Sequence, residues 1–253
     1  MEEKAVNAGK KIIRFFYEWL IFLVGALYFL FLGVLLSFLG LCLMPFLSKR
    51  QEHWSGRKGV HYFSRLFFAV LSLSGVVKVD CSELEQLRDE QGIILAPNHP
   101  CLMDALFVAS RMTNVVCVMK SSILYNPVFF GGAALSGFIQ SDYPLRFVHQ
   151  CQEALRSGGQ LLLFPEGTRT VAEKVNPFKG GFTLIAQKTG APIQTIIIET
   201  NTPFLGKHWP IWKKPQFPLI YQITLGKRFK VAKEENHRVF TKKIEKYFKD
   251  RLT

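Results

Sequence analysis

Gly-Ile-Ile-Leu-Ala-Pro-Asn-His-Pro-Cys-Leu-Met-Asp, residues 92–104, joins a short apolar run to a cluster of polar side chains. The run from Ile93 to Ala96 predicts a buried strand that ends at Pro97. The segment 105–109 beyond the cluster predicts a helix. His99 is therefore expected in the turn after a strand, and Asp104 in the first turn of the following helix.

His99 and Asp104 form a candidate catalytic pair. In α/β sheets the carboxyl ends of strands are where ligands bind, and a histidine oriented by a carboxylate is suited to act as a general base. On one continuous helix the two residues would lie about 140° apart, so they meet only if the chain bends, which Pro100 favours. Such pairs also occur by chance, which leaves a structural histidine as the alternative.

A second cluster strengthens the catalytic interpretation. The run from Leu161 to Phe164 predicts another buried strand, and Pro-Glu-Gly-Thr-Arg follows it directly at residues 165–169. Gly167 permits close approach of the backbone to a ligand, and Arg169 can hold a phosphate or carboxylate through two parallel hydrogen bonds. The alternatives are a surface salt bridge for Arg169 and an ordinary loop carboxylate for Glu166.

The composition indicates a basic, apolar protein that acts on an anionic partner. The 253 residues are 49% hydrophobic and carry a formal charge of +13, which suggests lipid headgroups, nucleic acid or a phosphorylated substrate. No helix-turn-helix, RNP or zinc-finger pattern occurs, so nucleic acid is not expected. Five cysteines without a Cys-x-x-Cys pair predict no disulfide framework, no metal site and a reducing compartment.

The N-terminal region predicts a membrane anchor. Residues 1–18 are basic and amphipathic, and residues 19–47 contain no charge. A spanning helix needs about 20 apolar residues, so this block is either one long tilted helix or a shorter hairpin that dips into one leaflet. Lysines and arginines are equally frequent on both sides, which favours the hairpin, with a bend at Gly33, Ser37 or Gly40.

The rest of the chain alternates strands with helices. We expect an amphipathic helix within 53–80, strands at Val76–Val79, Val115–Met119 and Ile193–Ile198, and a helix over Phe182–Lys188. This order predicts an α/β fold with a mixed sheet flanked by helices. It divides the chain into membrane-anchoring helices at 1–72 and an α/β domain at 73–253, whose tail from residue 207 carries 13 Lys or Arg against four acidic residues.

The two clusters resemble the motifs of the PlsC-like glycerolipid and lysophospholipid acyltransferases. Asn98, His99 and Asp104 match the family's first motif, Asn-His-x4-Asp, and Phe-Pro-Glu-Gly-Thr-Arg at 164–169 matches its third in full. The Phe-Lys-Gly-Gly-Phe stretch at 178–182 and the strand start at 191–193 are also similar. The resemblance covers roughly residues 75–200.

The resemblance implies transfer of an acyl chain from a thioester, acyl-CoA or acyl carrier protein, to a hydroxyl of a lipid, with no other cofactor. His99 would be the general base, oriented by Asp104. The residues expected to bind the substrate are Asn98, Lys120, Glu166, Gly167, Thr168 and Arg169. The partners would be membrane lipids. The active domain would lie on the cytoplasmic face of the membrane, and in a bacterium this would be the inner membrane. Nothing in the sequence addresses the oligomeric state.

The second motif departs from the family pattern. The family usually has an arginine that helps to bind the acceptor phosphate, whereas this chain has Gly-Phe-Ile-Gln-Ser-Asp at 137–142. Lysophosphatidate is the default acceptor, and a zwitterionic lysophospholipid, an amino-acid lipid or a polyene-type lipid is the alternative. Two other classes compete: a catalytically silent lipid-binding protein, and a metal-dependent hydrolase that uses His99 and Asp104 as ligands. No Gly-x-Ser-x-Gly elbow supports a serine hydrolase.

Overall fold

A seven-stranded sheet forms the centre of the protein in a computed structural model that describes residues 2–124 and 126–252. Its strand order is β1-β7-β6-β2-β5-β3-β4. The strands are β1 (Val77–Asp80), β2 (Ile94–Pro97), β3 (Val115–Met119), β4 (Ile139–Gln140), β5 (Gln160–Leu162), β6 (Ile193–Thr200) and β7 (Leu219–Phe229). The predicted strand at the start of the first motif is confirmed, and β2 lies near the middle of the sheet.

The sheet is mixed, as predicted. Every neighbouring pair is parallel except β6 with β7, which is antiparallel. The carboxyl ends of β6, β2, β5, β3 and β4 therefore share one edge of the sheet. Both sequence clusters follow strands of this group, so the topology brings them to the same edge.

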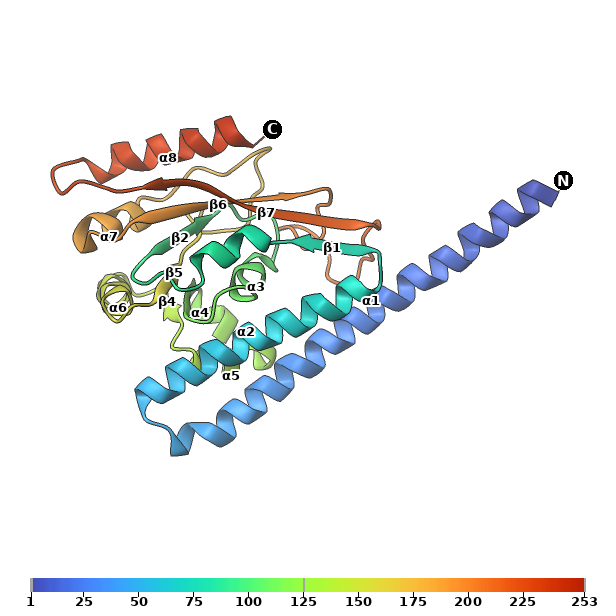
Figure 1. Cartoon of the computed structure of the whole chain (residues 1–253), viewed down its shortest axis with the longest axis horizontal. Coiled ribbons are helices and arrows are strands. Elements are labelled where there is room, and N and C mark those ends of the chain that lie inside the picture. Colours follow the sequence, from blue (N-terminus) through green and yellow to red (C-terminus); the bar gives the residue numbers. More distant parts are fainter. Residues whose placement is uncertain (1, 125, 253) are drawn as a thin grey trace.

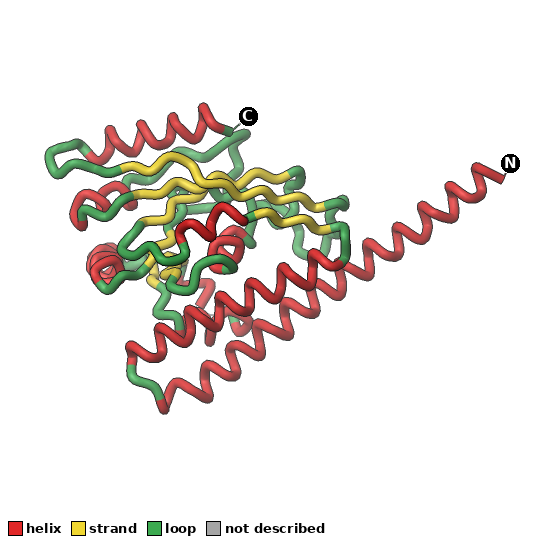
Figure 2. The backbone as a smooth tube through the Cα atoms, viewed as in Figure 1, coloured by secondary structure: helices red, strands yellow, loops and turns green. Residues whose placement is uncertain are grey.

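Helices cover both faces of the sheet (Figure 1; Figure 2). The helical elements are α1 (Glu2–Leu43), η1 (Met44–Phe46), α2 (Lys49–Leu73), η2 (Ser82–Leu87), α3 (Asp104–Ala109), α4 (Ser121–Leu124), α5 (Pro127–Leu135), α6 (Pro144–Arg156), α7 (Gly181–Thr189) and α8 (His237–Arg251). Alternate residues of β2 enter opposite cores, since successive strand side chains point to opposite faces. Ile94 packs with α6, α7 and α8, whereas Leu95 packs with α2 and α3.

The bend predicted at Gly33, Ser37 or Gly40 is wrong. α1 is one unbroken helix to Leu43, and the chain turns at η1 before α2 returns along it. Gly33, Ser37 and Gly40 lie inside α1, where their small size allows α5 to pack closely. A Cβ atom on Gly33, for example, would lie 2.4 Å from Val128. The hydroxyl of Ser37 accepts a hydrogen bond from the backbone N–H of Gly131 (3.2 Å).

The second amphipathic helix is confirmed with shifted bounds. α2 spans Lys49–Leu73 and begins with a capping box at Ser48, which satisfies backbone donors of the first turn. Among its apolar side chains Phe67 is buried, whereas Tyr62 and Leu66 are exposed. The exposed positions are explained by the packing of α2, whose buried side lies against α1, α3 and α5.

The basic C-terminal region is not a tail. Its residues form β7, which pairs with both β1 and β6, and α8, whose Phe240, Ile244 and Phe248 are buried against the sheet and α7. The lysines and arginines of α8 lie on its outer face, so the charge run conceals an apolar stripe at helical spacing. The antiparallel β7 is also what makes the sheet mixed.

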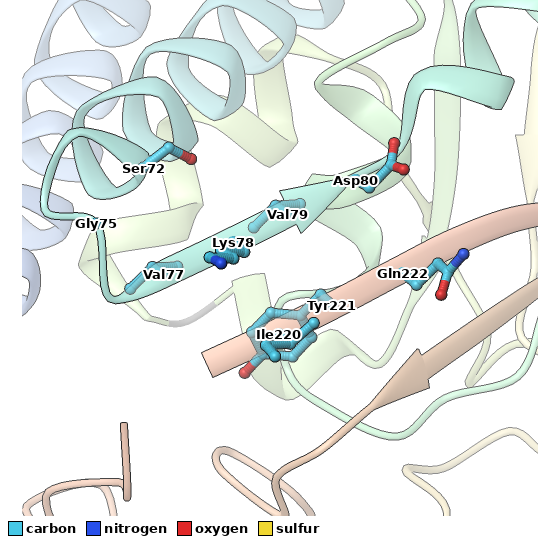
Figure 3. A pocket seen from close by; sticks show the side chains of 9 residues that line it. All are labelled: Ser72, Gly75, Val77, Lys78, Val79, Asp80, Ile220, Tyr221 and Gln222. Carbon is cyan, nitrogen blue, oxygen red and sulfur yellow. The ribbon is translucent and has the colours of Figure 1, made fainter. Parts of the chain in front are cut away.

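A hollow of about 550 Å³ lies over the far edge of the sheet, along β1 and β7. Figure 3 shows Asp80 and Gln222 at one end of these paired strands and Gly75 at the other. β6 lies between this hollow and β2. The hollow is therefore distinct from the carboxyl ends of β2 and β5, where the two sequence clusters lie.

Candidate active site

His99 and Asp104 contact each other directly. The Nδ1 atom of His99 lies 2.8 Å from the Oδ2 atom of Asp104, across the bend between β2 and α3. Asp104 is fully buried, whereas the side chain of His99 is 16% exposed. An ionised carboxylate only accepts hydrogen bonds, so Nδ1 carries the proton and Nε2 keeps its lone pair. The arrangement therefore orients a histidine for proton abstraction at its accessible nitrogen.

Cys101 completes the surroundings of the carboxylate. Its backbone N–H donates to Oδ2 of Asp104 (2.9 Å), and its thiol donates to Oδ1 (3.0 Å). Burial raises the pKa of Asp104, and the hydrogen bonds from His99 and Cys101 oppose that rise. Burial and the neighbouring Asp104 raise the pKa of the Cys101 thiol well above its usual range. The thiol therefore stays protonated and acts as a donor, a role that the sequence did not reveal.

The ring of His99 lies flat on the ring of Phe164, with the two centroids 3.8 Å apart and the planes at 19°. Phe164 belongs to the third motif and follows β5, the strand beside β2. The ring of Phe164 thus packs against one face of the His99 imidazole. Spacing alone could not identify this contact because the two residues are 65 positions apart.

Glu166 joins the two motif loops. Its Oε1 accepts the backbone N–H of His99 (3.0 Å) and the hydroxyl of Thr170 (2.7 Å), and its Oε2 accepts the backbone N–H of Asn176 (2.8 Å). Burial raises the pKa of Glu166, and these hydrogen bonds oppose the rise. Because both oxygens are engaged inside the protein, the geometry gives Glu166 a positioning role where the sequence suggested contact with the acceptor.

Asn98 is also engaged inside the protein. Its side-chain amide donates to the carbonyl of Ile198 (2.8 Å) and accepts the backbone N–H of the same residue (2.7 Å). Asn98 therefore extends the pairing of β2 with β6 by one residue beyond Pro97, which has no N–H. This reciprocal pair holds the backbone of His99 in place.

Arg169, Gly167 and Thr168 lie on the exposed side of the third-motif loop. Nη1 of Arg169 donates to the carbonyls of Leu205 and Gly206, both at 2.9 Å. Gly167 has a φ of +66°, which favours glycine, and its Cα faces the exposed side chain of Lys179. This loop therefore presents a turn and an arginine beside His99.

Lys120 lies further along the same edge, directly after β3. It is exposed and neighbours Asp142, which occupies the end of the second motif. Oδ2 of Asp142 accepts the backbone N–H of Ser121 at 2.6 Å, and hydrogen bonds from Ser121 lower the pKa of Asp142. The carboxylate therefore stays charged next to Lys120. Arg146, which follows the second motif closely in the sequence, is exposed on α6.

An open hollow of about 680 Å³ adjoins the loop between β2 and α3, which carries His99. Asn98, Pro100 and Thr170 form its wall next to the site, and the remainder comes from residues 171–174, 198–200, several residues within 202–213, and Leu252. The structure thus brings the histidine–aspartate pair, the third-motif loop and Lys120 to one edge of a mixed sheet. Fold and geometry define an α/β protein with a histidine–aspartate pair at the carboxyl ends of its central strands.

The chain is similar to known acyltransferases. A family model described as Acyltransferase matches residues 78–199. A 1-acyl-sn-glycerol-3-phosphate acyltransferase from the chloroplasts of Brassica napus is 27% identical over 152 residues, which are 56% of this chain and 43% of that protein. The enzyme of the same name from Pseudomonas aeruginosa is 26% identical over 156 residues, which are 59% of this chain and 58% of that protein. The chain thus spans about half the length of these relatives.

The fold also matches a solved structure over nearly its whole length. The crystal structure of the 1-acyl-sn-glycerophosphate acyltransferase PlsC from Thermotoga maritima superposes with a TM-score of 0.68 at 20% identity, covering 96% of this chain and 97% of that one. Residues 78–199 therefore match the Acyltransferase family model, and the chain has the same fold as PlsC.

Proposed function

We propose that this protein is a membrane-associated O-acyltransferase that moves an acyl chain from a thioester to a hydroxyl of a lysophospholipid. The observation that carries this proposal is the 2.8 Å contact between His99 Nδ1 and Asp104 Oδ2 at the carboxyl edge of the sheet. The names of the similar proteins from Brassica napus and Pseudomonas aeruginosa support lysophosphatidate as the default acceptor. Acyl-CoA or acyl carrier protein would supply the thioester.

In this proposal Nε2 of His99 removes the proton of the acceptor hydroxyl. The oxygen attacks the thioester carbonyl, a carbon–oxygen bond forms, and the carbon–sulfur bond breaks. The imidazolium, stabilised by Asp104, returns its proton to the leaving thiolate. Proton transfer of this kind contributes about 10²–10⁴-fold to the rate. The reaction needs no acyl-enzyme, which agrees with a Cys101 thiol that is buried and donates to Asp104.

Arg169 and Lys120 are the proposed contacts of the acceptor headgroup. Two carbonyls hold one edge of the Arg169 guanidinium, and its fork geometry suits a phosphate at the other edge. Lys120 adds a positive charge at the end of β3, beyond the third-motif loop in strand order. Gly167 and Thr168 would line the approach between them. A phosphate bound there would place the glycerol hydroxyl toward β2 and His99.

Asp142 favours a second candidate acceptor, a zwitterionic lysophospholipid. Its exposed carboxylate neighbours Lys120 and is held by the backbone of Ser121. A negative charge disfavours a second negative charge nearby, so Asp142 weakens the site for a phosphomonoester. The same carboxylate would attract the cationic group of a zwitterionic headgroup, while Arg169 holds the phosphodiester.

α1 is proposed to lie in the membrane surface. By length and composition, the 38-residue stretch Gly9–Phe46 could cross a membrane, and an 18-residue window within it has a mean hydropathy of 2.6. However, α1 contacts the rest of the protein over the stretch 14–40. At one end Arg14 donates a hydrogen bond to the carbonyl of Phe217, and at the other end Gly40 packs against α5. That length is about 39 Å at 1.5 Å per residue, longer than the bilayer core of about 30 Å. A spanning α1 would pull the folded domain into the hydrocarbon, whereas an in-plane helix leaves it on the cytoplasmic face.

An acceptor screen with the purified protein tests the proposal. Labelled acyl-CoA and acyl carrier protein are each offered with lysophosphatidate, zwitterionic lysophospholipids and phosphate-free lysolipids. We expect transfer to at least one phosphate-bearing acceptor and its loss in His99→Ala, since the base supplies about 10²–10⁴-fold. Equal turnover by His99→Ala and the unaltered protein would overturn the mechanism. Binding of lipid without transfer to any acceptor would favour the catalytically silent lipid-binding protein.

A further inference from the structure

The segment 202–218, which connects β6 to β7, projects two large apolar side chains into solvent. Ile211 is 70% exposed and Trp212 is 77% exposed, although the turn that carries them is closed by hydrogen bonds. The indole N–H of Trp209 donates to the carbonyl of Lys213 (2.9 Å), and the backbone N–H of Lys213 donates to the carbonyl of Pro210 (3.0 Å). The segment thus holds a fixed apolar tip, formed by Ile211 and Trp212.

The same segment is seated on α1. Lys214 forms an ion pair with Glu18, the guanidinium of Arg14 donates to the carbonyl of Phe217 (3.4 Å), and the rings of Phe22 and Phe204 meet edge to face at 6.3 Å. These contacts use α1 residues spaced by four, which form one face of the helix. Along this stretch α1 also exposes apolar side chains: Ile12, Ile13, Phe16 and Leu20.

Exposed lysines flank the tip. Lys213 follows Trp212 directly, and Lys207 stands on the near side of the turn. Basic residues close to an anionic membrane surface are attracted to its headgroups. Tryptophan favours the membrane–water interface because its ring is apolar and its N–H is polar. Charge and residue type therefore point to the same partner as the apolar surface of α1.

We propose that the tip formed by Ile211 and Trp212 inserts into the same bilayer surface as α1, with Lys207 and Lys213 at anionic headgroups. A protein partner is the weaker occupant, because a stable protein interface buries about 800 Å² on each side and two side chains supply much less. The proposal rests on the proposed membrane location of α1. It adds a second membrane contact, remote in sequence from the N-terminal helix.

The segment also reaches the active site at its other end. The carbonyls of Leu205 and Gly206 hold Arg169, and the carbonyl of Leu205 also accepts the backbone N–H of Leu102 in the catalytic loop (3.0 Å). Docking of the tip would therefore fix the segment that positions Arg169. The consequence is that acceptor presented in a bilayer is used better than the same acceptor in detergent.

Quenching of tryptophan fluorescence by brominated lipids tests the insertion without using activity. The full chain is bound to vesicles of phosphatidylcholine and phosphatidylglycerol, with and without bromine on the acyl chains. We expect the quenched fraction to fall in Trp212→Phe. A matched control restores the number of indoles by adding Val239→Trp to Trp212→Phe, since Val239 is 64% exposed on α8, across the sheet from α1 (Figure 1). The added indole should remain unquenched.

Quenching in Trp212→Phe equal to that of the unaltered protein, per remaining indole, would overturn the inserted tip. A second measurement uses the double variant Ile211→Ser with Trp212→Ser, for which we expect at least a fivefold loss of activity on vesicle-borne acceptor and less than a twofold loss in detergent micelles. Equal losses in both would overturn the link to the bilayer. Because quenching does not depend on turnover, a protein without acyltransferase activity would refute the proposed function and leave this test intact.

Discussion

The backbone N–H of His99 donates a hydrogen bond to Oε1 of Glu166, at 3.0 Å. The two residues are 67 positions apart and belong to the two motif loops that follow β2 and β5. Parallel pairing places the ends of these strands side by side, and the buried carboxylate then joins the loops. Glu166 thereby holds the backbone of His99, whereas Asp104 holds its ring.

Glu166→Ala should lower kcat by about 10²-fold, because a misplacement of the base by 1 Å has a cost of that order. The loss should appear mainly in kcat, with a small change in KM. Steady-state kinetics with saturating thioester measure both. Glu173→Ala, which removes an exposed carboxylate from the neighbouring segment, is the control. A large rise in KM at unchanged kcat would instead indicate that Glu166 contacts the acceptor.

Asp104→Asn should lower kcat by about 10²–10⁴-fold. The amide carries no negative charge and has only one accepting oxygen, so it does not stabilise the imidazolium and cannot accept from both His99 and the Cys101 thiol at the two positions. Single-turnover rates measure the effect, and circular dichroism checks that the variant is folded. Asp80→Asn, an exposed carboxylate at the end of β1, should keep full activity. Comparable activity in Asp104→Asn and Asp80→Asn would contradict the assigned role of the buried carboxylate.

Cys101→Ser should retain turnover within about threefold, whereas Cys101→Ala should lose about tenfold, the effect of one hydrogen bond of about 1.4 kcal/mol. A serine hydroxyl can replace the thiol as donor to Oδ1 of Asp104, and alanine cannot. A nucleophilic cysteine would instead lose activity in both variants. Alkylation of the native protein offers an independent check, because Cys42 is exposed and Cys101 is buried. Reaction should modify Cys42 and spare activity.

Asp142→Asn should lower the KM for lysophosphatidate, by about threefold to tenfold at low salt. Removal of one negative charge beside Lys120 strengthens the attraction for a phosphomonoester, and added salt screens this effect. Lys120→Ala should change KM in the opposite direction. Initial rates at two ionic strengths measure both. The zwitterionic acceptor would be supported if Asp142→Asn raised the KM for a zwitterionic lysophospholipid.

Glu245→Ala should destabilise the fold by roughly 1–3 kcal/mol at neutral pH, because it leaves the buried N–H of Phe178 without its acceptor. Burial favours the neutral carboxyl, but hydrogen bonds from Lys249, the Phe178 N–H and Lys242 outweigh it and lower the pKa of Glu245 to about 2. The stabilisation is therefore complete above the ordinary pKa near 4.5 and is lost as the pH falls toward 2.

Thermal denaturation between pH 7 and pH 3 measures this dependence. The difference in Tm between the unaltered protein and Glu245→Ala should be constant above about pH 5 and shrink below it. Glu234→Ala, an exposed carboxylate before α8, is the control and should show no such change. A Tm difference that stays constant down to pH 3 would contradict a charged Glu245.

Local pattern was sufficient for the elements next to the motifs. β3 is found at the predicted residues, because a short, valine-rich apolar run favours a strand. α7 and β6 include the predicted residues, because Gly190 ends the helix and Pro192 precedes the strand. β7 and α8 were not predicted, and the region was described only as a basic tail. In α8 charged residues alternate with the apolar positions, so the sequence shows a run of positive charge, and only the tertiary packing places Phe240 and Ile244 in the core.

The extent of α1 shows the same limit. Small residues within an apolar helix are compatible with a bend or with close helix packing, and only the position of α5 decides between them. The turn of the hairpin lies instead at Met44–Phe46, where Pro45 interrupts the helical hydrogen bonds. The sequence shows the small residues of α1, but it does not show that α5 packs against them.

The sequence by itself determined the pair His99 and Asp104, the third-motif loop and the α/β class, because these depend on residue type and spacing along the chain. Only the tertiary structure decided that Asn98 and Glu166 are engaged by the protein, that Cys101 donates to Asp104, and that 202–218 connects α1 with Arg169. The physical reason is that a polar side chain meets its partner through strand pairing and loop packing. Those partners lie up to about 200 positions away, beyond any local pattern.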